Sequence, residues 1–211
     1  MTLVSALSAQ ESSVRLQAAL AVGTRADPGL LEALVARCAV EPDFFVRDML
    51  TWALTRLPAE LTVPRLVAEL GSSVAQARSQ ALHTLSKVGD GRAWPALTPS
   101  LLRDPDDEVA RAAWRTAVAL VPDGEQEGLA VELAAQLGRG DRNVQLSLSR
   151  ALVALGGEVV VPVLRRVRAD PGMQAHARAT EMLLRDPEAG FDAAIEEAKR
   201  IVALGPQHAD R

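Results

Sequence analysis

The sequence predicts an all-α protein built as a solenoid of about six helix–turn–helix repeats with a C-terminal capping helix. Apolar residues recur at intervals of 31 to 35 residues along the 211-residue chain. Within each interval they are spaced by four and eight, as on one stripe of a helix. Aromatic residues make up only 3% of the chain and tyrosine is absent, so Ala, Leu, Val and Arg dominate and favour helix over strand.

Six anchor positions carry this period: Val14, Val46, Ala77, Val109, Val144 and Ala175. The residues four and eight positions beyond each anchor are apolar in every repeat, so each anchor begins an amphipathic helix, here called helix B. An acid stands three residues before the anchor in four repeats, where it can accept hydrogen bonds from free N–H groups: Glu11, Asp43, Asp106 and Asp141. Gly89 and Gly156 suit the ends of two B helices.

A second amphipathic segment, helix A, precedes each B helix. These segments are expected at residues 2–10, 30–39, 63–70, 93–102, 129–137 and 159–167. Pro64, Pro95 and Pro162 are expected near helix starts, where the missing N–H costs least, whereas Pro99 is expected to kink its helix. A final helix at 188–204 would cover the last repeat, with Glu196 and Glu197 on its outer side.

The domain prediction is one solenoid spanning residues 1–205, followed by a polar tail at 206–211. Its repeats are expected at 1–25, 26–58, 59–90, 91–122, 123–156 and 157–186, with a cap at 187–205. The competing fold is an irregular helical bundle. A bundle has no reason to repeat about every 32 residues, so we favour the solenoid.

Three segments resemble HEAT repeats: SSVRLQAALAVG from residue 12, ARSQALHTLSKVGD from residue 77, and DPDDEVARAAWRTAVAL from residue 104. They are most similar to the short bacterial type first associated with phycobilin lyases, within the armadillo-like folds. The resemblance implies a right-handed α–α superhelix with A helices outside and B helices lining the concave face, where partners bind. It also implies that Arg15, Arg47 and Arg78, each directly after an anchor, stack as a structural ladder that bonds acids and carbonyls. In the fourth repeat the arginine is shifted to Arg111.

The position six residues beyond the anchor is expected to face solvent on the concave side. It holds Leu20, Trp52, His83, Arg115, Arg150 and Glu181. Equivalent positions in stacked helices lie about 8–10 Å apart, so the four central residues would form a partner-binding stripe. Met49, Asp48 and Gln80 would lie beside it and Trp114 at its flank. The alternative for Trp52 and Trp114 is a place in the core between helices.

Several other residues are expected to have packing roles. Phe44, Phe45 and Trp94 are predicted to pack inside the fold, with the edge of the groove as the alternative for Phe45. Cys38, the only cysteine, is predicted to be an inert packing residue that forms no disulfide.

The chain carries no recognisable catalytic motif, and we expect no cofactor and no metal site. Its histidines, His83, His176 and His208, lack the three- or four-residue spacing that metal sites on a helix use. A net charge of −4 argues against general binding of nucleic acid. No signal peptide or transmembrane run is visible, so we expect no membrane contact and a cytoplasmic location.

The leading functional prediction is a non-catalytic interaction module, or scaffold, that binds a protein or peptide partner on its concave face. Trp52, His83 and Arg115 would lie at the centre of that face. One alternative is a HEAT-like DNA-binding enzyme of the alkylpurine DNA glycosylase type. Another is a tetrapyrrole lyase or its chaperone. The chain is expected to be a monomer, or a weak homodimer that pairs through Ile195 and Ile201.

Overall fold

The structure is a computed structural model that describes residues 2–186 and 191–204. Every regular element in these two ranges is a helix, and none is a strand, which confirms the all-α prediction. The helices group into two compact units, Met1–Leu120 and Val121–Arg211. None of the described helices is long and apolar enough to cross a membrane.

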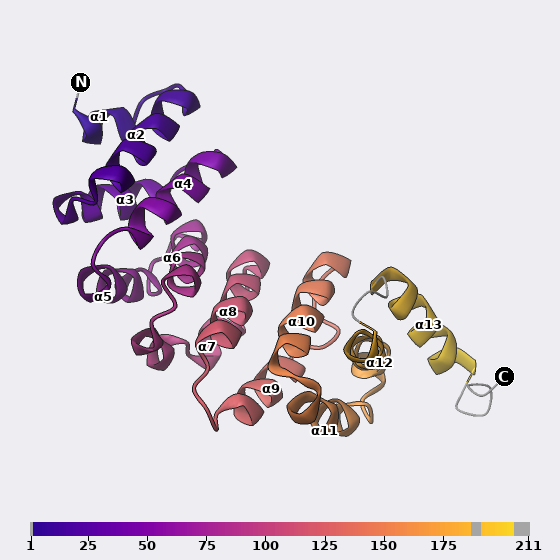
Figure 1. Cartoon of the computed structure of the whole chain (residues 1–211). Helices are drawn as coiled ribbons and strands as arrows, with labels where there is room; N and C mark the ends of the chain where they lie inside the picture. The colour runs from indigo at the N-terminus through magenta and orange to yellow at the C-terminus, as the bar shows by residue number, and fades with distance from the viewer. Residues whose placement is uncertain (1, 187–190, 205–211) are drawn as a thin grey trace. The chain divides into compact units, whose positions relative to one another are not determined.

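The first unit is a stack of helical hairpins (Figure 1). Its B helices pack against one another in chain order: α2 (Ser12–Arg25), α4 (Phe44–Thr55), α6 (Ala75–Val88) and α8 (Asp107–Leu120). Each is covered by the A helix of its own repeat: α1 (Leu3–Leu7), α3 (Leu31–Cys38), α5 (Ala59–Glu69) and α7 (Pro99–Leu102). Two 3₁₀ helices, η1 (Pro28–Leu30) and η2 (Gly91–Ala96), lie before α3 and α7. This arrangement is that of an α-solenoid.

The second unit continues the same pattern of hairpins. It consists of α9 (Gln126–Ala134), α10 (Arg142–Leu155), α11 (Gly157–Val167), α12 (Pro171–Arg185) and α13 (Phe191–Leu204). Helix α13 packs on α12, and Ile195 is buried in their shared core beside Ala179 and Leu183. Burial of Ile195 removes it from the apolar patch expected to pair two copies, although Ile201 is half-buried. The expected start of this helix at Glu188 and the tail at 206–211, including His208, lie outside the described residues.

The apolar triplets form the core of both units. All of their residues are buried except Val14 and Ala175, which are half-buried. The position five residues beyond the anchor is also buried in every repeat, because a B helix is covered both by its A helix and by neighbouring B helices. It holds Ala19, Thr51, Leu82, Trp114, Ser149 and Thr180. The buried face of each B helix is therefore wider than the apolar pattern alone predicts.

The predicted helix ends are confirmed in most places. The carboxylates of Asp43, Asp106 and Asp141 accept hydrogen bonds from backbone N–H groups in the first turn of α4, α8 and α10. Glu11 precedes α2 but makes no such side-chain bond. Gly89 ends α6 with φ of 70°, a left-handed conformation that costs glycine little.

Two predictions about prolines need correction. Pro64 and Pro162 lie inside α5 and α11, because α5 begins about one turn earlier than expected and α11 about half a turn earlier. The helix expected at 93–102 is divided instead into η2, which contains Pro95, and α7, which begins at Pro99. Proline at the first position of a helix loses no internal hydrogen bond, so Pro99 starts α7 and does not kink a longer helix.

Candidate functional site

The first ladder position is a buried ion pair. The Arg15 Nε and Nη2 atoms donate to the Glu41 carboxylate at 2.7 and 2.8 Å, and Arg15 Nη1 donates to the carbonyls of Ala9 and Gln10. Burial alone would raise the pKa of Glu41. The hydrogen bonds from Arg15, Arg37 and the Asp43 N–H outweigh it and lower that pKa to about 2. Glu41 is therefore a carboxylate at neutral pH.

The third ladder position repeats this geometry, whereas the second does not. Arg78 donates to both carboxylate oxygens of Asp104, at 3.0 and 3.1 Å, and each paired acid lies 26 residues beyond its arginine. Arg47 donates to the carbonyls of Glu41 and Pro42, but the residue 26 positions beyond it is Ser73. In the part of the chain that the structure describes, Arg47 has no carboxylate partner.

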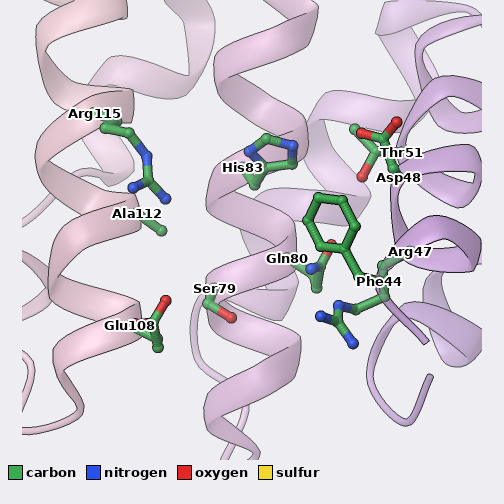
Figure 2. A pocket seen from close by; sticks show the side chains of 10 residues that line it. All are labelled: Phe44, Arg47, Asp48, Thr51, Ser79, Gln80, His83, Glu108, Ala112 and Arg115. Atoms are coloured by element: carbon green, nitrogen blue, oxygen red, sulfur yellow. The ribbon is translucent and has the colours of Figure 1, made fainter. Parts of the chain in front are cut away.

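A groove lies over the three adjacent B helices α4, α6 and α8 (Figure 2). Its volume is about 280 Å³, and it is lined by Phe44, Arg47, Asp48, Thr51, Ser79, Gln80, His83, Glu108, Ala112 and Arg115. A second hollow of about 300 Å³ shares Arg47, Ser79, Gln80 and Glu108 with it and adds residues at the start of α6 and α8. We call the first of these the B-helix groove. It brings Asp48, Gln80, His83 and Arg115 of the predicted stripe together.

Two buried polar atoms of the B-helix groove have no partner among the described residues. They are Thr51 Oγ1 and Gln80 Oε1. Thr51 is only 3% exposed, and its hydroxyl does not bond back to the preceding turn as helical threonines usually do. An unused buried hydrogen-bonding group costs about 1–3 kcal/mol, so these two atoms lower the stability of the folded chain.

The charged walls of the groove are only partly neutralised. Glu108 accepts a hydrogen bond from Arg111 at 2.6 Å, so its charge is engaged. Asp48 and Arg115 are exposed, and neither makes an ion pair within the described residues. Partial desolvation, followed by the nearby charge of Arg111, lowers the pKa of Arg115 below its ordinary value. The charge of Glu108 opposes this lowering of the pKa, and Arg115 remains a cation at neutral pH without an ion-pair partner among the described residues.

His83 stands between the two outer helices of the groove. Burial lowers its pKa, the charges of Lys87 and Arg115 lower it further, and Asp48 opposes them. The pKa therefore lies below the ordinary value of 6.5, and the imidazole is neutral at pH 7. A neutral imidazole can donate one hydrogen bond and accept another.

Phe44 and Phe45 are exposed, which corrects the prediction that they pack inside the fold. Their side chains are 65% and 71% exposed, and the rings meet edge to face with centroids 5.6 Å apart. Phe44 lines the B-helix groove beside Gln80 (Figure 2). The Arg47 guanidinium lies 6.0 Å from the centre of the Phe44 ring. These rings form an apolar margin at the N-terminal end of α4.

The two tryptophans of the predicted surface lie elsewhere. Trp52 is 38% exposed but does not line the groove, because its ring packs against Gly23 of α2. Trp114 is fully buried, and its Nε1–H donates to the Leu102 carbonyl at 2.8 Å, so it has the place in the core that was the alternative to the flank of the groove. Met49 is half-buried and outside the groove.

The remaining predicted residues are divided between the units. Arg150 is exposed on α10 of the second unit. Glu181 is 9% exposed and binds Arg168, so the sixth position does not face solvent in the last repeat. His176, in the ladder position of that repeat, accepts from the Gly138 N–H at 3.0 Å and packs against Ser149. Its role in the described structure is that of a buried hydrogen-bonding residue.

Cys38 is buried, as predicted, and it is a free thiol. Burial raises the pKa of this thiol to about 12, so it is protonated and unreactive at neutral pH. Among the described residues, no cluster of His, Cys, Asp and Glu could hold a metal ion.

Comparisons with known proteins concern the fold. No protein-family model matches the sequence, and no curated protein matches it. An engineered protein solved by the Northeast Structural Genomics Consortium is similar, with a TM-score of 0.50 and 20% identity over 96% of this chain and 95% of that chain. The complex of CpcE and CpcF of phycocyanin lyase from Nostoc sp. PCC7120 aligns with a TM-score of 0.37 and 17% identity over 95% of this chain and 93% of that one. The first likeness concerns the fold alone, and the second is too weak to carry an argument.

Proposed function

We propose that this chain is a HEAT-like interaction module that binds a peptide segment of a partner protein in the B-helix groove. The observation that carries the proposal is the B-helix groove itself, a hollow of about 280 Å³ across three adjacent B helices whose lining includes Phe44, His83 and Arg115. A peptide supplies both donors and acceptors along its backbone and could pair with the polar side chains of this lining.

The dimensions and rigidity of the groove support the same function. A volume of about 280 Å³ accommodates a few side chains of a peptide, and the adjoining hollow of about 300 Å³ extends the surface. Its walls are three packed helices, so binding orders little of this chain. Phe44 and Phe45 add exposed aromatic area beside polar groups, a combination typical of binding hot spots.

The DNA glycosylase alternative receives little support from the groove. Within the described residues, its lining offers only two cations without an acidic partner, Arg47 and Arg115, beside one unpaired carboxylate, Asp48, and His83 is neutral at pH 7. A surface that binds DNA neutralises several phosphates and needs a clear basic excess. The tetrapyrrole alternative rests on repeat type alone, and the one thiol of the chain is buried and protonated.

A peptide-display selection tests the proposal. A random peptide library is selected on the full chain, and enriched peptides are then measured against two variants. Ser79→Trp places an indole in the middle of the B-helix groove, whereas Ala68→Trp places the same bulk on the exposed face of α5. Circular dichroism and thermal unfolding establish that both variants fold.

We expect enriched peptides to lose binding to Ser79→Trp and to keep it with Ala68→Trp. Two results would count against the proposal: a selection that enriches no peptide, and enriched peptides that bind both variants equally well.

A further inference from the structure

The spacing of the ladder singles out Arg47 among the three arginines. Arg15 and Arg78 each form two hydrogen bonds with an acid 26 residues further on. The corresponding residue for Arg47 is Ser73, which cannot neutralise a charge. Arg47 keeps the carbonyl contacts of the ladder, so its position is fixed, yet its charge is unmatched within the described chain.

A second unmatched cation lies on the opposite wall. Arg115 extends from α8, and Figure 2 shows it on the far side of α6 from Arg47, with Ser79 and Gln80 between them. It makes no ion pair among the residues described. The groove thus presents a positive charge from each of its outer helices, in a chain whose net charge is −4.

The acids of the groove do not cancel these charges. Glu108 is bound to Arg111, so only Asp48 offers a free carboxylate among the described lining residues. Thr51 lies one turn after Arg47 on α4, and its hydroxyl has no hydrogen-bond partner among the described residues. The groove therefore suits a segment that is negatively charged and accepts hydrogen bonds.

We propose that the partner segment is acidic, and that its aspartate or glutamate side chains bind in the B-helix groove, at Arg47 on one wall and at Arg115 on the other. This inference rests on the proposed function, since it names the chemistry of the peptide that occupies the same groove. At each wall of the groove a carboxylate of the segment accepts from the guanidinium group, of Arg47 on α4 and of Arg115 on α8. A neighbouring apolar side chain of the peptide packs on Phe44.

The composition of the selected peptides provides the first test. Peptides that bind wild type but not Ser79→Trp should be enriched in Asp and Glu relative to the unselected library. The variant Arg115→Glu, selected in parallel, should instead enrich Lys and Arg. Groove-binding peptides without acidic enrichment would overturn this inference and leave the proposed function intact, whereas a selection without groove binders would overturn both.

Titration of one selected peptide provides the second test. Arg115→Gln should weaken its binding at least tenfold, and replacing the acidic residue of the peptide by its amide should do the same. When both changes are made together, the fold loss of peptide affinity should be much smaller than the product of the two separate fold losses. Arg25→Gln is the matched control, since Arg25 is an exposed arginine at the end of α2 that does not line the B-helix groove; its effect should stay below twofold.

Competition distinguishes a carboxylate from a phosphate. A DNA duplex and a phosphoserine version of the same peptide are added to the preformed complex. The acidic peptide should withstand both at equal concentration. If the duplex or the phosphopeptide displaces it and itself loses binding to Ser79→Trp, the groove is a phosphate site and the proposal of an acidic side chain is wrong.

Discussion

The ring of Trp52 occupies the space that a Cβ atom on Gly23 would require. A Cβ built at Gly23 would lie 2.7 Å from Trp52 Cε3 and 2.9 Å from Ala53 Cα. The first contact is with a rigid ring and the second with backbone, so neither can yield cheaply. The absence of a side chain on α2 thus determines where the largest residue of α4 packs.

Gly23→Ala should therefore destabilise the protein, although alanine favours helix by about 0.5–1 kcal/mol over glycine. Overpacking costs about 1–3 kcal/mol and outweighs that gain. Gly128→Ala is the matched control, because Gly128 lies within α9 and a Cβ there meets nothing within 4 Å. Urea unfolding should show a lower midpoint for Gly23→Ala and an equal or higher one for Gly128→Ala. Equal midpoints for both variants would mean that Trp52 does not pack on Gly23.

Glu41 should be one of the most sensitive residues in the first unit. It is fully buried and accepts hydrogen bonds from both Arg15 and Arg37. Glu41→Gln leaves two arginines without their counter-charge and should cost about 3–5 kcal/mol in the free energy of unfolding.

A surface pair gives the control for Glu41. Glu32 binds Arg65 at 2.9 Å but is largely exposed, so Glu32→Gln should cost less than about 1 kcal/mol. Chemical denaturation of both variants measures the difference, and a similar small loss for both would show that the Glu41 network is not stabilising.

Removal of the unused Thr51 hydroxyl should not lower the stability of the protein, in contrast to the change at Glu41. Because Thr51 Oγ1 has no partner among the described residues, Thr51→Val should leave stability unchanged or raise it by about 1 kcal/mol. The same change at Thr116 should cost about 1–3 kcal/mol, since that hydroxyl lies 2.8 and 2.7 Å from the Leu82 and Ala112 carbonyls. Thermal unfolding of the two variants decides the point; an equal loss at Thr51 would mean that its hydroxyl is bonded within the folded chain.

His176 should make stability depend on pH. Burial lowers its pKa to about 4, whereas in the unfolded chain the value is about 6.5. Between these values the unfolded chain binds a proton that the folded chain excludes. The stability contributed by neutral His176 is therefore fully present above pH 6.5 and falls as the pH drops toward 4, by about 3 kcal/mol in all.

The geometry explains why protonation at His176 is costly. Its Nδ1 accepts from the Gly138 N–H, so the neutral ring carries its proton on Nε2, beside the Gln145 carbonyl. Unfolding followed from pH 7 to pH 4 should show most of the slope disappearing in His176→Gln and persisting in His83→Gln. A slope that survives in His176→Gln would assign the pH dependence to other groups.

The fold could be predicted from the sequence because its cause is local and repeated. The triplets four and eight residues from each anchor encode one stripe of every B helix, and the caps at Asp43, Asp106 and Asp141 encode the starts. The position of the groove could be predicted in part. His83 and Arg115 share the sixth repeat position and line it together.

The positions of the other site residues depend on contacts between repeats. The apolar pattern within a single B helix does not encode these contacts. Trp114 can be buried because the carbonyl of Leu102, 12 residues earlier in the chain, accepts a hydrogen bond from its indole N–H. Trp52 turns away from the groove because Gly23 leaves room for it on α2. The missing acid at Ser73 was visible in the sequence, but the 26-residue rule that gives it meaning appears only once Glu41 and Asp104 are seen to bind Arg15 and Arg78.

The most direct measurement is an amide NMR titration of the full chain with an acidic peptide from the selection. The account predicts that the largest shift changes fall on α4, α6 and α8, around Thr51, Gln80, His83 and Arg115. It also predicts that they vanish when the acidic residue of the peptide is replaced by its amide. Shift changes concentrated on the A helices or in the second unit, or unchanged by that replacement, would contradict it.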